Sequence, residues 1–189
     1  MKEQLDLKMY FFVPYNISDK QIGIQAGHSA LRYARKFGAG DENAWVWDFV
    51  DNHETWIILD GGTTNNSLDH PGSLQEIYRS IINYNDSINF SSGKLSISSF
   101  YEPDLNDTLT SFCFIVDERV WNYDDFISFK KYFMDLPSVF GRNKSIDNKL
   151  SYDELKNNYP KIHKKWTDEI MGDEKNVFIR ELLTGKKLA

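Results

Sequence analysis

Apolar positions near the start of the chain predict a strand followed by an amphipathic helix. Over Leu7–Pro14, apolar side chains fall on both faces of an extended chain, as in a buried central strand. Ser18 and Gln21 have the spacing of a capping box, which predicts a helix over residues 19–37 with Gly38 and Gly40 as C-terminal caps. Apolar residues at spacings of three and four predict the packed side of this helix: Ile22, Ala26, Ala30, Tyr33, Ala34 and Phe37.

The pattern along the rest of the chain predicts an α/β fold. We expect a four-stranded mixed sheet covered by helices in a domain of residues 1–122, with a C-terminal helical extension over residues 123–189 packed on it. The other predicted strands are 55–59, 95–101 and 110–116. The other predicted helices are 42–51, 73–84 with Ser73 as its cap, 124–134, 152–158 and 173–184.

Composition narrows the class of protein. Hydrophobic residues make up 41% of the 189, enough for a packed core, and the longest apolar runs are too short to cross a bilayer. The polar N-terminus lacks the apolar stretch of a signal peptide, so we expect a cytoplasmic protein that does not enter membranes. The single cysteine, Cys113, is expected to be a buried strand residue, and no cysteine or histidine spacing indicates a metal site.

Charge is distributed unevenly around a net value of −6. Residues 1–127 hold 9 Lys and Arg against 19 Asp and Glu, whereas residues 128–189 hold 13 against 9. An acidic body with a mildly basic tail differs from the usual nucleic-acid binder, which concentrates positive charge on one surface. The extension is expected to pack on the domain or on a second copy of the chain, which would form a homodimer.

A polar stripe runs along the first predicted helix. It consists of Gln21, Gln25, His28, Arg32 and Arg35, at spacings that place them on one side. One interpretation is a solvated helix face. The other is a site lined by Gln25 and His28 at the start of the helix, where ligands gather in open α/β sheets.

Two segments resemble the type II peptidyl-tRNA hydrolases. Residues 21–30, Gln-Ile-Gly-Ile-Gln-Ala-Gly-His-Ser-Ala, resemble that family's Lys-Ile-Ala-Ala-Gln-Cys/Val-Ala/Ser-His-Ala-Ala motif. Residues 101–110, Tyr-Glu-Pro-Asp-Leu-Asn-Asp-Thr-Leu-Thr, are similar to its Asp-Ala-Gly-x-Thr-Gln loop before the last strand. The resemblance covers about residues 7–120, and residues 180–189 look like the end of tailed-phage members of the superfamily.

The resemblance implies hydrolysis of the ester between a peptide and tRNA, without a metal or another cofactor. By position, the family's Lys becomes Gln21, its Asp becomes Glu102 or else Asp104, and its Thr becomes Thr110. The implied catalytic residues are Glu102, Thr110, His28 and Lys20, which is adjacent to Gln21. The implied binding residues are Gln21, Gln25, Arg32, Asp104 and Asn106. Because glutamine cannot supply a positive charge, the loss of the lysine affects the stabilisation of an oxyanion.

Two functions therefore stay open. One is a hydrolase of aminoacyl- or peptidyl-tRNA, acting in the host cytoplasm if a phage encodes it. The other is a binding protein on the same fold, which holds a small nucleotide-like ligand or a host protein and fits a phage role against host defence.

Two further segments each have two possible interpretations. Residues 60–66 are a plain loop or a phosphate cradle, and residues 161–166 are a solvated turn or a basic and aromatic contact for nucleic acid.

Overall fold

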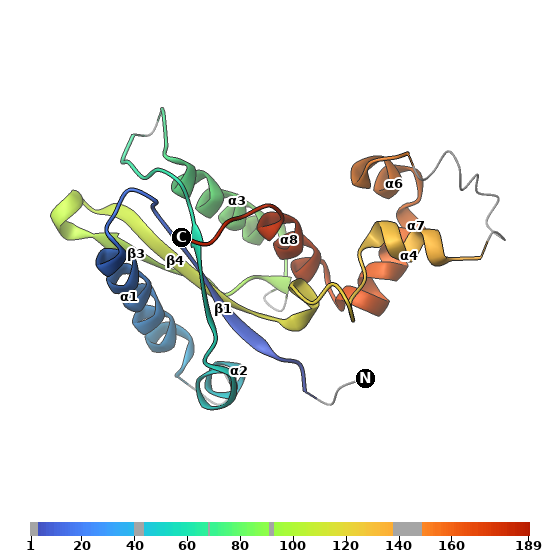
Figure 1. Cartoon of the computed structure of the whole chain (residues 1–189), viewed down its shortest axis with the longest axis horizontal. Helices are drawn as coiled ribbons and strands as arrows, with labels where there is room; N and C mark the ends of the chain where they lie inside the picture. The colour runs from blue at the N-terminus through green and yellow to red at the C-terminus, as the bar shows by residue number, and fades with distance from the viewer. Residues whose placement is uncertain (1–3, 40–43, 68, 91–92, 138–148) are drawn as a thin grey trace. The chain divides into compact units, whose positions relative to one another are not determined.

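The computed structural model describes residues 4–39, 44–67, 69–90, 93–137 and 149–189 (Figure 1). Contacts within the chain divide it into two compact units. Unit 1 comprises Met1–Glu118 and Leu183–Ala189, and unit 2 comprises Arg119–Leu182. The predicted domain border lay after residue 122, and the last seven residues, predicted as part of the extension, belong to unit 1 instead.

Unit 1 is built on one mixed sheet of four strands in the order β2-β1-β4-β3. β1 pairs in parallel with β2 and antiparallel with β4, and β4 pairs antiparallel with β3. Across the residues that the structure describes, this sheet is combined with seven α-helices, which confirms an α/β fold with a four-stranded mixed sheet. The strands are β1 Leu7–Val13, β2 Trp56–Asp60, β3 Ser98–Glu102 and β4 Thr108–Asp117.

The central position of β1 follows from its apolar faces. Phe11, Phe12 and Val13 are fully buried. The Phe11 ring lies in the core beneath α1 (Asp19–Phe37), whereas the Phe12 ring stacks on Phe112 on the opposite face, with centroids 4.9 Å apart. Because successive side chains of a strand point to opposite faces, both faces of the sheet need a covering layer.

Helix α1 covers one face and has the predicted bounds. The predicted capping box is present: the Ser18 side chain accepts from the Gln21 backbone N–H, and the Gln21 side chain accepts from the Ser18 N–H. Ala26 and Tyr33 are fully buried against the sheet, as the spacing predicted. Gly38 caps the C-terminus through a hydrogen bond to Ala34.

Helix α3 (Ser73–Ser87) covers the other face, where Tyr78 contacts Phe112 with ring centroids 5.5 Å apart. The prediction that Ser73 caps this helix is wrong, because Gly72 holds the N-cap position. The Ser73 hydroxyl instead accepts a hydrogen bond of 2.9 Å from the Thr63 backbone N–H. Ser73 therefore ties the preceding loop to the helix.

The exposed edge of β2 is partly covered by the end of the chain. The Asp60 N–H donates to the Lys187 carbonyl, and the Ala189 N–H donates to the Ile58 carbonyl, both at 3.0 Å. This pairing between β2 and the C-terminal residues is invisible to local patterns because it joins segments far apart in the chain.

The predicted helix over residues 42–51 corresponds to α2 (Ala44–Asp48) followed by a π-helical turn, Phe49–His53.

Unit 2 has a separate core of aromatic and aliphatic side chains, which includes Phe129, Phe133, Trp166 and Met171. Its helix α6 has the predicted bounds, α8 differs from its prediction by one residue at each end, and α4 begins later than predicted, after its N-cap Ser128. The helices are α4 Phe129–Asp135, α6 Tyr152–Asn158, α7 Pro160–Trp166 and α8 Glu174–Leu183.

The basic segment over residues 161–166 was predicted as a solvated turn or a nucleic-acid contact. The turn is wrong because the segment is helical, whereas the nucleic-acid contact stays a prediction for the exposed Lys161, Lys164 and Lys165. The segment forms α7, in which His163 and Trp166 are buried. The Trp166 indole N–H donates to the Ile127 carbonyl at 3.0 Å. Two of its side chains therefore belong to the core, because their apolar surface has more to gain from burial than from solvent contact.

Candidate functional site

The β3–β4 hairpin positions the site on the face of the sheet that α1 covers. Its turn contains Asn106 and Asp107, both with positive φ (54° and 52°), a conformation that Asn and Asp tolerate better than most residues. Beyond the turn, Phe100 pairs with Ser111 and Tyr101 pairs with Leu109, which leaves Thr110 as an extra residue in β4. Such a β-bulge re-aims side chains.

Three of the predicted site residues meet at this bulge. The Gln25 side-chain amide of α1 donates to Glu102 Oε2 at 2.7 Å, and the Thr110 hydroxyl donates to Gln25 Oε1 at 2.6 Å. Gln25 is 7% exposed and Thr110 is 1% exposed, whereas Glu102 is partly exposed. The amide therefore links a buried hydroxyl to a carboxylate that solvent reaches.

A second hydroxyl anchors the helix at the same point. Ser111 donates from its hydroxyl to the Gln25 backbone carbonyl at 2.7 Å. Thr110 and Ser111 are consecutive, yet both contact Gln25, and the bulge explains how two neighbours in a strand reach the same face. Sequence analysis missed Ser111; its only signal is a second hydroxyl directly after Thr110, ahead of the apolar part of the strand.

His28 lies one turn beyond Gln25 on α1. Its ring packs on Phe100 of β3, with centroids 4.3 Å apart, and its Nδ1 atom is buried without a hydrogen bond to any residue that the structure describes. The guanidinium of Arg32 lies over the same Phe100 ring at 4.5 Å. Much of the predicted polar stripe thus lies along β3 rather than forming only a solvated face.

The basic end of α1 borders a shallow depression of about 450 Å³. It is lined by Arg32, Arg35, Lys36, Ser98 and Ser99. Lys36 donates to the Ile97 carbonyl at 3.2 Å, and Arg32 donates to the Ser99 carbonyl at 3.4 Å. Three cations are therefore gathered beside β3, the strand that ends at Glu102. They form a local basic surface although residues 1–127 are acidic as a whole.

The other predicted site residues lie outside this network. Gln21 is engaged in the capping box, and Lys20 is exposed about 140° around the helix from Gln25. Asp104 is exposed in the 3₁₀ turn Pro103–Leu105, and the Asn106 carbonyl accepts from the Asn66 side chain. Among the described residues, none of these four side chains hydrogen-bonds to Gln25, Glu102 or Thr110.

The surroundings of the Cys113 thiol and of the loop after β2 disfavour a reactive or binding role for either. Cys113 is buried as predicted, and burial raises the pKa of its thiol to about 12, so it is not a nucleophile near neutral pH. The backbone N–H groups of Gly61, Gly62 and Thr63 donate to Val13, Asp60 and Ser73, respectively. These three N–H groups are therefore engaged within the fold and are not free to hold a phosphate.

Within the described ranges, no three His, Cys, Asp or Glu side chains lie close enough to hold a metal ion. No helix in these ranges combines the length and the apolar character needed to cross a membrane.

Comparisons with known proteins assign no family. Neither the scan against protein-family models nor the search of curated proteins finds a match for this chain.

The network leaves one reactive group available. In the described part of the chain, Glu102 Oε1 makes no hydrogen bond, while Oε2 is held by Gln25. A carboxylate fixed through one oxygen and open at the other can accept a proton from a bound water. This arrangement can support general-base chemistry on a neutral electrophile.

Proposed function

We propose that this protein is a peptidyl-tRNA hydrolase-like esterase that acts on aminoacyl- or peptidyl-tRNA. The observation that carries the proposal is the convergence of Gln25, Glu102 and Thr110, joined by hydrogen bonds of 2.7 and 2.6 Å. All three were selected from the sequence by their similarity to the type II peptidyl-tRNA hydrolases. A chance resemblance in two short segments would not require these side chains to meet across an interface between a helix and a bulged hairpin.

In the proposed reaction, Glu102 Oε1 accepts a proton from water as the water oxygen bonds to the ester carbonyl carbon. The C–O bond to the ribose then breaks, and Glu102 returns the proton to the leaving ribose oxygen. Gln25 orients the carboxylate, and Thr110 in turn fixes the rotation of the Gln25 amide. Gln25 and Thr110 are positioning residues in this scheme.

The oxyanion that forms on the carbonyl requires a donor. No ammonium group stands at position 21, and Lys20 lies on another side of α1. We assign this role to a ring N–H of His28, the next polar residue along α1 from Gln25, whose ring packs on Phe100 of β3. A single ring N–H replaces the ammonium group of the family's lysine in this role, so we expect slow turnover.

The basic depression supplies the contact with nucleic acid. Arg32, Arg35 and Lys36 line it, and each can neutralise one backbone phosphate. Its alignment with Glu102 along β3 suits a substrate whose ester lies at the carboxylate and whose backbone follows the cations. Affinity should fall steeply as salt concentration rises.

The decisive experiment compares Glu102→Gln with Asp104→Asn in a peptidyl-tRNA hydrolysis assay. Each substitution removes one carboxylate charge, and the two residues are two positions apart, but only Glu102 contacts Gln25. We expect Glu102→Gln to slow hydrolysis by about 100-fold or more, the usual contribution of a general base, and Asp104→Asn to change it by less than about twofold. Wild-type protein that leaves peptidyl-tRNA intact at high concentration would refute the esterase.

A second function is favoured by one feature of the same network. The Thr110 proton is already donated to Gln25, so this hydroxyl does not donate to an oxyanion. This favours a catalytically altered member of the fold that holds a nucleotide-like ligand without cleaving it. Tight binding of peptidyl-tRNA or a nucleotide, weakened by Glu102→Gln and without hydrolysis, would identify this case.

A further inference from the structure

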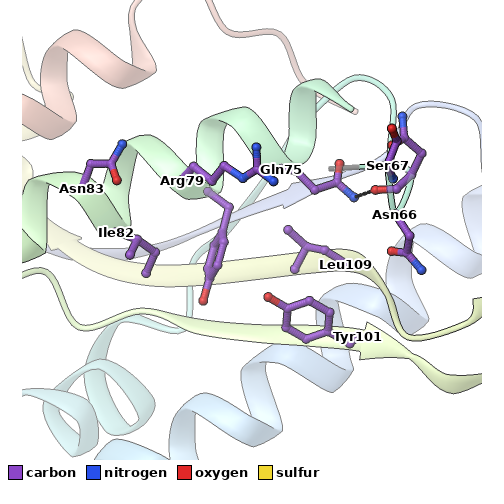
Figure 2. A pocket seen from close by; sticks show the side chains of 10 residues that line it. Asn66, Ser67, Gln75, Arg79, Ile82, Asn83, Tyr101 and Leu109 are labelled. Atoms are coloured by element: carbon purple, nitrogen blue, oxygen red, sulfur yellow. Dashed lines mark hydrogen bonds between the residues drawn. The ribbon is translucent and has the colours of Figure 1, made fainter. Parts of the chain in front are cut away.

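The opposite face of the sheet contains a cavity of about 360 Å³ between α3, the hairpin and the loop before α3 (Figure 2). Its volume lies in the range of about 300–1,000 Å³ that is usual for small-molecule sites. Tyr101 and Leu109 line it, and each directly precedes a residue of the ester site in the sequence, Glu102 and Thr110. Because side chains alternate along a strand, the two sites lie on opposite faces of one hairpin.

The floor of the cavity is apolar and aromatic. Figure 2 shows the Tyr101 ring and Leu109 on the strands, with Ile82 projecting from α3 above them. Tyr78 also lines the cavity, held by its ring contact with Phe112 and by a hydroxyl contact of 3.4 Å with Ser99. Two phenol rings with partly open faces are suited to stacking on a planar ligand.

Side-chain amides form much of the polar part of the wall. They belong to Asn65, Asn66, Gln75 and Asn83. The orientation of Gln75 is set, because its Nε2 donates to Thr64 Oγ1 at 2.7 Å and to the Asn65 carbonyl at 2.6 Å. The Asn65 oxygen accepts from the Ser67 N–H, and the Asn66 amide donates to the Asn106 carbonyl. Within the part of the chain that the structure describes, the Asn65 side-chain N–H groups, the Asn66 oxygen and the whole Asn83 amide are left to supply the donors and acceptors that the edge of a nucleobase requires.

Arg79 is the only charged residue among those that line the cavity. It is exposed and makes no ion pair with any residue in the described ranges. Burial, and then the neighbouring Tyr78, raise the pKa of Tyr101, so its phenol stays neutral at physiological pH. A cavity with one guanidinium and no carboxylate favours an anionic ligand over a cationic one.

We propose that this cavity binds one unpaired nucleotide. The base stacks on Tyr78 and Tyr101, the amides of Asn65, Asn66 and Asn83 contact its edge, and the phosphate pairs with Arg79. Aromatic stacking combined with hydrogen bonds to a base edge is how proteins generally hold unstacked bases. The nucleotide is either a free mononucleotide or the end of a single-stranded RNA. This site does not depend on the esterase, because the residues proposed for ester cleavage are on the other face.

The test titrates the full-length protein with AMP, GMP, CMP and UMP by calorimetry, and with the matching nucleosides. We expect at least one monophosphate to bind and its nucleoside to bind at least about tenfold more weakly, because the charged contact to Arg79 is lost. Arg79→Gln should weaken the binding of the monophosphate by a similar factor and leave the affinity for the nucleoside unchanged. Lys161→Gln, which removes an exposed charge in unit 2, is the matched control and should leave both affinities unchanged.

A second variant tests the aromatic contact. Tyr101→Ala should weaken binding of the nucleoside and the monophosphate by the same factor, of about tenfold, because both depend on stacking. Competition of the bound mononucleotide with a single-stranded tetranucleotide identifies the source: displacement at lower concentration indicates an RNA end, and displacement only at higher concentration indicates a free nucleotide. The proposal is overturned if no monophosphate binds at millimolar concentration, or if binding survives both Arg79→Gln and Tyr101→Ala unchanged.

Discussion

Both units bury polar side chains, and they differ in how the hydrogen bonds of those side chains are completed. In unit 2, the Arg180 guanidinium donates to the backbone carbonyls of Arg119, Val120 and Phe126, and the Tyr123 ring covers it at 4.4 Å. In unit 1, Gln25 joins two side chains, and the network ends at a carboxylate oxygen with no described partner.

The difference lies in how much of each network remains accessible to a ligand. Arg180 is 5% exposed and its donors serve the fold of residues 119–126, so little of it remains for a ligand. Glu102 is held on one side only and is partly exposed. A buried polar group closed by backbone carbonyls serves the fold, whereas a network that ends in solvent leaves an atom that a ligand can reach.

The largest effect should come from breaking the closed network. Arg180→Met should destabilise unit 2 by about 3 kcal/mol or more, because three backbone carbonyls lose their donor in a buried place. Amide hydrogen exchange of unit 2 during urea titration measures it. Lys161→Met, at an exposed position in the same unit, is the control. Equal stability of the two variants would contradict the structural role of Arg180.

Opening the network of unit 1 should lower the free energy of unfolding by less than the loss of Arg180 does in unit 2. Gln25→Leu leaves the Thr110 hydroxyl and Glu102 without their shared partner and should destabilise unit 1 by about 2 kcal/mol. If the esterase proposal holds, hydrolysis should also slow by about 100-fold, because the carboxylate loses its orientation. Thermal unfolding and the hydrolysis assay measure the two effects. Loss of stability with unchanged turnover would reduce Gln25 to a structural residue.

A pH effect should distinguish the units. Burial, and then Lys156, lower the pKa of His163 to about 4, and its Nε2 lies 2.8 Å from the Tyr152 hydroxyl. The unfolded chain takes up a proton near pH 6.5, before the folded chain does, so the free energy of unfolding should fall as pH drops from about 6.5 to about 4.

This loss should be confined to unit 2 and be on the order of 2 kcal/mol, allowing for solvent screening. Denaturation at a series of pH values measures it. His163→Gln, which does not titrate, should flatten the profile over this range. A profile unchanged by this substitution would show that other groups govern the pH dependence.

The smallest effect compares two capping boxes, one in each unit. Ser18 caps α1 and Ser151 caps α6, each with the reciprocal contact from the third residue of the helix. Ser18→Ala and Ser151→Ala should each lower stability by about 1 kcal/mol. Urea denaturation measures it, with Ser→Thr at the same positions as controls. A loss from threonine as large as that from alanine would argue against capping.

Local rules accounted for much of the fold. The bounds of α1 and α6 follow from a capping box at the start of each helix, and β1 follows from its apolar faces. Ser73 misled the prediction because its hydroxyl serves Thr63 in the loop instead of the helix. Helix α7 was not predicted, although it begins at Pro160 and proline is well suited to the first turn of a helix.

For the candidate site, the sequence alone selected Gln25, Glu102 and Thr110, because short motifs retain the order and spacing of chemical groups. It did not separate Glu102 from Asp104, or Gln21 and Lys20 from the network. The first distinction depends on the bulge at Thr110 and on the turn at Asn106 and Asp107, which set the direction of the hairpin side chains. The second depends on α1, where Gln21 is engaged in the capping box and Lys20 lies on another side of the helix. The cavity beneath α3 and the pairing of β2 with residues 187–189 also arise only in the folded chain. The physical reason is common to the hairpin, the cavity and the pairing: helix caps and apolar periodicity act between near neighbours, whereas register and burial depend on segments that meet only after folding.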